Sequence, residues 1–258
     1  MSEPRGPQTR LPLLIGSAAV VVIAIVAIAF GVNNASAPLP AVPTAKPTAK
    51  APTPTPSPTA AATFAFADCS TAKFGPVLKP INPPASVHTY SAAPPVTINL
   101  SKLYQATIAT AKGDIVLCLQ PELAPNTVNV FVTLARNHFY DGNPFHRVVA
   151  GFVIQAGDPN CAGHVPVAPA TPSGSCGNGG PGFQFNDEPV HQSYVAGCVA
   201  MANSGANTNG SQFFICTAND SSLPKSYNLF GKVESGMPVA LKIAQGDVIT
   251  SITVREQI

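Results

Sequence analysis

Two stretches of the chain carry the side chains whose types and spacing could do chemistry. Residues 145–159 read Phe-His-Arg-Val-Val-Ala-Gly-Phe-Val-Ile-Gln-Ala-Gly-Asp-Pro and place the cation of Arg147 and the carboxamide of Gln155 among β-forming and aromatic residues. Residues 201–215 read Met-Ala-Asn-Ser-Gly-Ala-Asn-Thr-Asn-Gly-Ser-Gln-Phe-Phe-Ile. The chain has neither a Gly-x-Ser-x-Gly motif nor an evident acid-base pair. These residues therefore offer hydrogen bonding from a cation among apolar neighbours rather than nucleophilic attack.

The cysteines leave two interpretations open. Cys161 and Cys176 bracket a loop rich in Pro, Gly and Ser, and a disulfide between them would stabilise the fold by about 3 kcal/mol by restricting the unfolded chain. With His164 they could instead be three metal ligands, but a structural zinc site needs four, so we expect no metal and no cofactor. Cys198 and Cys216 lie in apolar, strand-like runs and are interpreted as small core residues.

The order and spacing of three motifs resemble the cyclophilin signature. They are Phe-His-Arg at 145–147, Gly-Phe-x-Ile-Gln-x-Gly-Asp-Pro at 151–159 and Asn-Thr-Asn-Gly-Ser-Gln-Phe-Phe-Ile at 207–215. The resemblance runs from about Tyr104 to Val254 and implies a peptidyl-prolyl cis-trans isomerase, with Arg147 donating a hydrogen bond to the prolyl nitrogen and Gln155 positioning the substrate. His146 is expected to be a hydrogen-bonded structural residue. The resemblance implies a substrate-binding surface formed by Phe152, Val153, Ala202, Asn203, Gln212, Phe214, Leu223 and Tyr227.

Three positions depart from the pattern of the family. Ser222 stands where cyclosporin-sensitive members carry a tryptophan, which implies weak or no cyclosporin binding. Val153 replaces an expected methionine but stays apolar, and Tyr227 replaces a common pocket histidine with a ring that could still cover a proline. None of the three removes the proposed donor, so we expect activity.

The hydrophobic pattern predicts many short strands and two helices. Residues 104–110 and 115–119 predict a β-hairpin with Gly113 available for a positive φ, residues 125–136 predict a helix, and residues 238–245 predict a second helix ending at Gly246. The resemblance implies a mainly β fold, a closed eight-stranded antiparallel barrel capped by two helices, which we assign to residues 99–258. Residues 64–98 are interpreted as an extension leading into this domain.

The N-terminal part predicts a membrane tether. Residues 11–32 are 22 uncharged and mostly apolar residues, enough to cross about 30 Å of hydrocarbon and longer than the apolar region of a cleaved signal peptide, the alternative interpretation. Arg5 and Arg10 precede the span, so residues 1–10 are expected in the cytoplasm. Residues 33–63, rich in Pro, Ala and Thr, predict a linker that forms no core. We therefore expect a single-pass membrane protein with its folded domain outside the cytoplasm.

The charge balance of the folded part does not favour nucleic acid as a partner. Of 14 Lys and Arg residues and 12 acids, four basic residues and one acid precede Phe64, which leaves ten basic and eleven acidic residues, a net charge of −1, from there on. This balance gives no reason to expect nucleic-acid binding. The expected partners are proline-containing polypeptides, and a monomer is expected. The alternative functions are a non-catalytic proline-peptide-binding or chaperone module and a structural role in the cell envelope.

Overall fold

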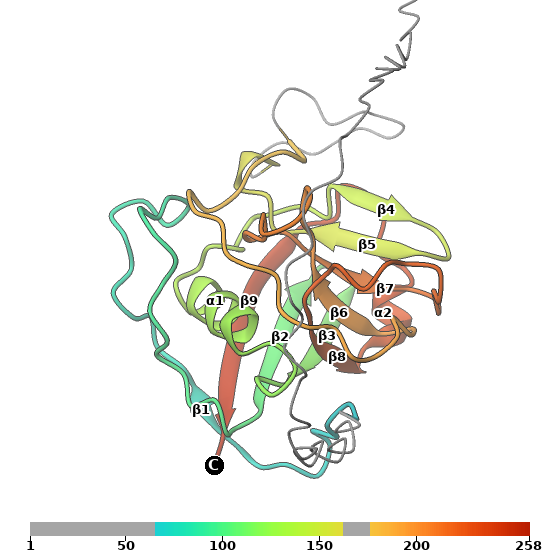
Figure 1. The fold of residues 1–258 in the computed structure, drawn as a ribbon, viewed down its shortest axis with the longest axis horizontal. Coiled ribbons are helices and arrows are strands. Elements are labelled where there is room, and N and C mark those ends of the chain that lie inside the picture. The colour runs from blue at the N-terminus through green and yellow to red at the C-terminus, as the bar shows by residue number, and fades with distance from the viewer. Residues whose placement is uncertain (1–64, 162–175) are drawn as a thin grey trace, which may run out of the picture. The chain divides into compact units, whose positions relative to one another are not determined.

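The computed structural model describes residues 65–161 and 176–258, and Figure 1 shows how their helices and strands are arranged. These residues belong to one of two compact units, residues 57–258. The predicted cytoplasmic segment, membrane anchor and linker, residues 1–63, lie outside the described residues. Within the two described ranges, no helix is both long and apolar enough to span a bilayer.

Nine antiparallel strands form one sheet in the order β1-β9-β2-β3-β8-β6-β7-β5-β4. The strands are β1 (Phe74–Val77), β2 (Tyr104–Thr110), β3 (Gly113–Leu119), β4 (Arg147–Val149), β5 (Val153–Ala156), β6 (Cys198–Met201), β7 (Phe213–Cys216), β8 (Leu229–Ser235) and β9 (Ile249–Gln257). Figure 1 shows β4 and β5 at one end of the fold and β1 at the other.

The predicted closed barrel of eight strands is wrong in two respects. A ninth strand, β1, comes from the extension and pairs with β9, and within the described residues the end strands β1 and β4 share no ladder. Pro144, which precedes β4, forms an isolated bridge with Val248, the residue before β9. The backbone N–H groups of Phe145 and Ile249 donate to the carbonyls of Asp247 and Asn143 on either side of this bridge, both at 2.8 Å. The contact does not extend into a ladder between β4 and β9, so the sheet is not closed.

The predicted hairpin and first helix form the main core. β2 and β3 pair with Thr110 opposite Gly113, and Gly113 has a φ of +118°, which a residue with a side chain rarely adopts. The helix α1 (Pro125–Arg136) has the predicted bounds and packs against β9 and β8. Alternate residues of β2, such as Ala106 and Ile108, are buried in the cluster that the sheet shares with α1.

The extension covers the side of α1 that faces away from the sheet. The amide oxygen of Asn129 accepts a hydrogen bond from the backbone N–H of Thr97 (3.0 Å), and its NH₂ group donates to the carbonyls of Pro94 and Pro95. Nε of Arg136 donates to the carbonyl of Lys79 at 2.7 Å. Residues 127–135 are consequently all buried, including positions that the helical periodicity left polar.

The second helix is shorter than the predicted range 238–245. α2 spans Met237–Ala240, and beyond it the backbone N–H groups of Lys242 and Ile243 bond to carbonyls three residues back. Such bonds close the tighter turns of a 3₁₀-helix. Nζ of Lys112 donates to the carbonyl of Lys242 at 2.8 Å, so a side chain from the hairpin turn occupies an acceptor in this turn.

Three disulfides join the cysteines in pairs: Cys69–Cys118, Cys161–Cys176 and Cys198–Cys216. The interpretation of Cys198 and Cys216 as plain core residues is wrong, although both are buried. The ladder between β6 and β7 puts Val199 opposite Ile215, so the two cysteines face each other with Cα atoms 5.3 Å apart. That separation lies in the range that a disulfide requires.

Candidate active site

The register of the short strands sorts their side chains onto two faces of the sheet. One row across β4, β5, β7 and β6 consists of Val148, Ile154, Ile215 and Val199 and packs in the main core. The next row consists of Arg147, Gln155, Phe214 and Ala200. Because directly opposed residues of an antiparallel pair share a face, this second row points away from the main core. Two residues predicted to do chemistry, Arg147 and Gln155, thus stand beside an aromatic ring.

A cavity of about 240 Å³ opens on this second face. It is lined by Arg147, Phe152, Val153, Gln155, Ala202, Asn203, Phe214, Leu223 and Tyr227. The structure therefore brings together all the predicted catalytic and substrate-binding residues except Gln212. The cavity combines one cation and two amides with apolar and aromatic surface.

A second, smaller apolar cluster forms the wall of the cavity. Val153 and Phe214 are buried, and the ring of Tyr227 meets the ring of Phe214 edge-on with centroids 5.6 Å apart. Tyr194, which we did not predict, fixes Tyr227 because its hydroxyl donates to the carbonyl of Tyr227 (2.8 Å) and accepts from its N–H (3.0 Å). Nothing in the sequence around Tyr194 indicates which residue its hydroxyl reaches, and only the fold shows it.

Arg147 lies at the polar edge of the cavity. Its Nη1 donates to Oε1 of Gln155 at 3.3 Å, and its guanidinium carbon lies 5.6 Å from the centroid of the Phe152 ring. Among the described residues, no carboxylate pairs with it. A guanidinium has five N–H donors, so most of those of Arg147 remain available to a ligand.

Gln212 lies in an adjoining groove of about 620 Å³ that shares Gln155, Ala202 and Asn203 with the cavity. Oε1 of Gln212 accepts a hydrogen bond from Nε2 of Gln155 at 2.9 Å. A peptide that crosses from the groove into the cavity would therefore pass Ala202 and Asn203, two residues of the predicted substrate-binding surface.

His146 is buried next to Arg147 with a relative exposure of 3%. Burial lowers its pKa, and the nearby Asp158 and the side chain of Gln212 offset part of that effect. Neither ring nitrogen has a hydrogen-bond partner of good geometry in the described part of the chain. The hydrogen bond expected of this histidine is therefore not formed within the described residues, although Asp158 and Gln212 lie near the ring.

Two turns place the remaining residues of the cavity rim. The carboxylate of Asp220 accepts hydrogen bonds from the N–H and hydroxyl of Ser222 and from the N–H of Leu223, and these bonds lower its pKa. Nδ2 of Asn203 donates to the carbonyl of Ser226 at 2.7 Å. Asp220 was not predicted, although an Asp two residues before a Ser is a recognisable turn signal.

The structure does not support a metal site formed by Cys161, His164 and Cys176. Cys161 and Cys176 are bonded to each other, and His164 lies outside the described residues. In the described ranges, no group of three His, Cys, Asp or Glu side chains could hold a metal ion.

Comparisons with known proteins agree on one family. The model of the family described as cyclophilin type peptidyl-prolyl cis-trans isomerase/CLD matches residues 105–258. A peptidyl-prolyl cis-trans isomerase of Helicobacter pylori is 41% identical over 157 residues, 59% of this chain and 88% of the relative. Peptidyl-prolyl cis-trans isomerase B of Bacillus subtilis is 39% identical over 138 residues, 53% of this chain and 87% of the relative.

A solved structure agrees with the sequence relatives. The crystal structure of a cyclophilin type peptidyl-prolyl cis-trans isomerase from Cryptosporidium parvum is 27% identical and superposes with a TM-score of 0.51. The matched region covers 59% of this chain and 97% of that one. The similarity is thus to most of the length of each relative, and the residues matched by the family model, 105–258, contain all the residues that line the cavity.

Proposed function

Because the chain belongs to the family of cyclophilin-type peptidyl-prolyl cis-trans isomerases, we propose that its cavity holds the proline ring of a polypeptide substrate and that Arg147 donates a hydrogen bond to the prolyl nitrogen. The observation that carries this proposal is the row in which Arg147, Gln155 and Phe214 stand side by side above the cavity. In this row Gln155 lies between the cation and the apolar ring, and all three residues line the cavity that a proline would fill.

The reaction explains why these two kinds of surface are needed. Rotation about the X–Pro bond breaks amide conjugation and localises a lone pair on the prolyl nitrogen, and the uncatalysed flip takes tens to hundreds of seconds. Raising its rate constant from about 0.01 to about 10³ s⁻¹ requires about 7 kcal/mol of transition-state stabilisation. One preorganised donor typically supplies about 3–4 kcal/mol.

The rest of the stabilisation is assigned to orientation and to the apolar wall. Val153 and Phe214 present buried hydrocarbon to the substrate, and such surroundings favour the twisted amide over the more dipolar planar one. Gln155 accepts from Arg147 and so restricts the guanidinium to a position beside the bound amide. No proton transfer or covalent intermediate is required.

The test is an NMR exchange assay of a proline peptide with the full chain and its Arg147→Ala and Arg147→Lys variants. Loss of the donor should lower kcat/KM by about 10²- to 10³-fold in the alanine variant. The lysine variant keeps the charge but lacks the planar fork, so its activity should lie between the two. Unchanged thermal unfolding would show that the variants remain folded. An alanine variant within twofold of the wild type would overturn the role of Arg147.

The same assay separates the alternative function. If no protein accelerates the flip but all bind the peptide, the cavity is a proline-recognition site, and the binding-module alternative holds. If the wild-type protein accelerates the flip and a second proline peptide inhibits that reaction, catalysis takes place in the cavity and the enzyme function holds.

We further propose that the enzyme acts outside the cytoplasm on folding polypeptides. Two features support this location: the apolar residues 11–32 and the pairing of all six cysteines in disulfides, which form and persist in oxidising compartments. Protease treatment of intact cells that carry a C-terminal epitope tag on the chain should remove the tag. A tag that becomes accessible only after the membrane is permeabilised would contradict the proposal.

A further inference from the structure

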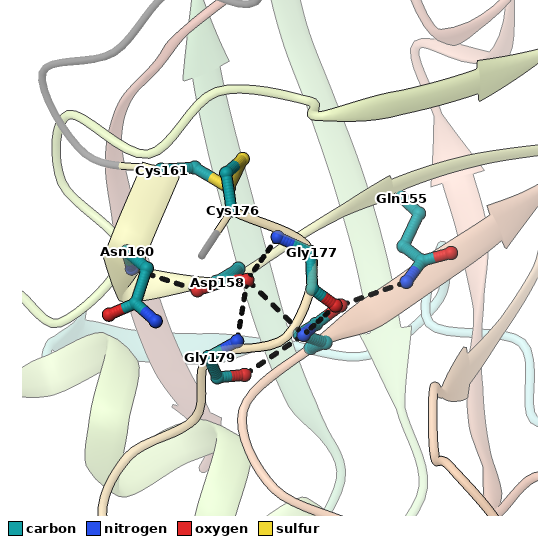
Figure 2. The surroundings of a disulfide bond; sticks show 8 residues. Gln155, Asp158, Asn160, Cys161, Cys176, Gly177 and Gly179 are labelled. Carbon is teal, nitrogen blue, oxygen red and sulfur yellow. Dashed lines mark hydrogen bonds between the residues drawn. A yellow bond between two sulfur atoms is a disulfide. The ribbon is translucent and has the colours of Figure 1, made fainter. Parts of the chain in front are cut away.

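The Cys161–Cys176 disulfide stands at one end of a chain of hydrogen bonds that reaches Arg147. Figure 2 shows the disulfide beside Asp158, with Gly177 and Gly179, which follow Cys176, turned toward the Asp158 carboxylate. The carbonyls of these two glycines accept hydrogen bonds from Nε2 of Gln212 at 3.1 and 2.9 Å. Gln212 in turn contacts Gln155, and Gln155 contacts Arg147.

Asp158 holds this glycine segment in place. Its carboxylate is completely buried and accepts hydrogen bonds from the backbone N–H groups of Asn160 (2.8 Å), Gly177 (2.5 Å) and Gly179 (2.8 Å). The approach is so close that a Cβ atom added at Gly179 would overlap Oδ1 of Asp158. The segment therefore has one position against Asp158, and a side chain at residue 179 would displace it.

The hydrogen bonds have a fixed polarity along the chain. A carboxamide has donors only on nitrogen and acceptors only on oxygen. Because the carbonyls of Gly177 and Gly179 take the NH₂ group of Gln212, its Oε1 must face Gln155, and the NH₂ group of Gln155 must face Gln212. Oε1 of Gln155 is thereby presented to the guanidinium of Arg147, which can only donate. A reversed Gln212 amide would set oxygen against two carbonyl oxygens.

From this geometry we infer that Asp158 and the Cys161–Cys176 disulfide are positioning elements for Arg147. The inference rests on the proposed role of Arg147 as donor and adds the residues that orient it. The disulfide joins residues 15 apart in sequence and sets the point at which the chain returns to Asp158. Without it, hydrogen bonds alone would have to bring Gly177 and Gly179 back, against the entropy of closing the loop.

The experiment compares two disulfide deletions in the full chain. The Cys161→Ser/Cys176→Ser variant removes the bond beside Asp158, and the Cys69→Ser/Cys118→Ser variant removes the bond that joins the extension to β3. A Gly179→Ala variant displaces the same segment while keeping all three disulfides. The substrate is a short capped X–Pro peptide, which fills the cavity without reaching far into the groove.

We expect kcat to fall about 10- to 100-fold in the first and third variants, because misplacing a positioned group by about 1 Å has effects of this size. The Cys69/Cys118 variant should keep kcat within about twofold. In ¹⁵N NMR spectra, the side-chain signals of Gln155 and Arg147 Nε should broaden or shift in the two slow variants and not in the control. A merely structural loss would lower the melting temperature without moving these signals selectively.

Each other outcome is decisive. If the Cys161→Ser/Cys176→Ser and Gly179→Ala variants both keep the wild-type kcat while Arg147→Ala loses it, the positioning inference is wrong and the proposed function stands. If Arg147→Ala also keeps kcat, the proposed role of Arg147 fails first. If the cysteine variant does not fold, Gly179→Ala decides the matter alone, and a wild-type kcat in that variant overturns the inference.

Discussion

The half of the sheet formed by β1, β9, β2 and β3 differs from the half formed by β6, β7, β5 and β4 in how its two faces are used. In the first half, β2 alternates between buried and half-buried residues along most of its length, so mainly one face is packed. In the second half, all residues of β6 and β7 are buried, because one face packs in the main core and the other in the cluster behind the cavity.

We therefore expect the first half of the sheet to contribute mainly to stability and the second half to carry the site as well. The first half has strands of seven to nine residues in β2, β3 and β9, and their packed faces lie in the main core. The second half has strands of three and four residues, and its second face ends in an open cavity. Substitutions in the two halves should therefore have different signatures.

The largest difference is expected from two matched deletions, Phe131→Ala and Phe214→Ala. Phe131 is buried among the rings of Tyr140, Phe213 and Phe230, with centroids 5.2–5.3 Å away, so its removal should lower the free energy of unfolding by about 3–5 kcal/mol. Phe214 borders an existing cavity, so its removal should cost at least about 1 kcal/mol less but raise KM for a proline peptide. Urea unfolding and steady-state kinetics check both. Phe131 belongs to the main core and Phe214 to the cluster behind the cavity, so equal losses of stability would remove the distinction between these two clusters.

A smaller effect on stability is expected at the start of α1, where Glu188, from a loop between β5 and β6, caps the helix. The carboxylate of Glu188 accepts hydrogen bonds from the N–H and side chain of Asn126 and from the N–H and hydroxyl of Thr127, at the start of α1. Glu188→Ala should lower the free energy of unfolding by about 1–2 kcal/mol, as loss of an N-cap does. The exposed Asp114→Ala is the control in urea unfolding and should stay within about 0.5 kcal/mol of the wild type.

The pH dependence of the free energy of unfolding should show the effect of His146, the buried histidine that directly precedes β4. Burial puts the folded pKa of His146 below its ordinary value of 6.5, so below pH 6.5 the unfolded chain takes up a proton that the folded chain does not. Stability should be present above pH 6.5 and be lost as the pH falls toward the folded pKa, by at most about 1.4 kcal/mol per pH unit. Urea unfolding between about pH 5 and 7.5 measures this slope. His146→Phe should flatten it, and an unchanged slope would assign it to another group.

The smallest effect on stability is expected at the rim of the cavity. Ser222 donates to Asp220 in an exposed turn, and the aromatic residue found in cyclosporin-sensitive relatives is missing there. Calorimetry should show weak or no cyclosporin binding to the wild type. Ser222→Trp should tighten binding by about 1 kcal/mol through added aromatic contact and leave the free energy of unfolding within about 0.5 kcal/mol. Tight binding by the wild type would show that a tryptophan at 222 is not needed.

Local patterns predicted the elements that depend on neighbours in sequence. The bounds of α1 and the hairpin of β2 and β3 follow from periodicity and a turn, and both formed as expected. The cavity residues were predicted only through a family resemblance, because nothing in the type of Phe152 or Leu223 distinguishes a cavity wall from a core. The structure then placed them around one space.

Contacts between distant residues could not be predicted. β1 pairs with the last strand of the chain, Glu188 caps a helix that begins 63 residues earlier, and Asp158 binds a segment beyond the insertion. Each depends on which surfaces meet after folding, and a single Asp or Glu in a sequence carries no sign of it. The closed barrel failed for the same reason, since closure depends on how far two distant segments pair, and here they meet only at the isolated bridge between Pro144 and Val248.

The pairing of the cysteines bears on how the protein is made. Cys69 bonds to Cys118, Cys161 to Cys176 and Cys198 to Cys216. The first cysteine thus pairs with the second, the third with the fourth and the fifth with the sixth, so no two loops overlap. Six cysteines allow 15 complete pairings, but a chain that meets an oxidant N-terminus first exposes each correct partner before any later competitor. Biosynthesis in that order can reach the native pattern without reshuffling, at the pace at which the polypeptide emerges.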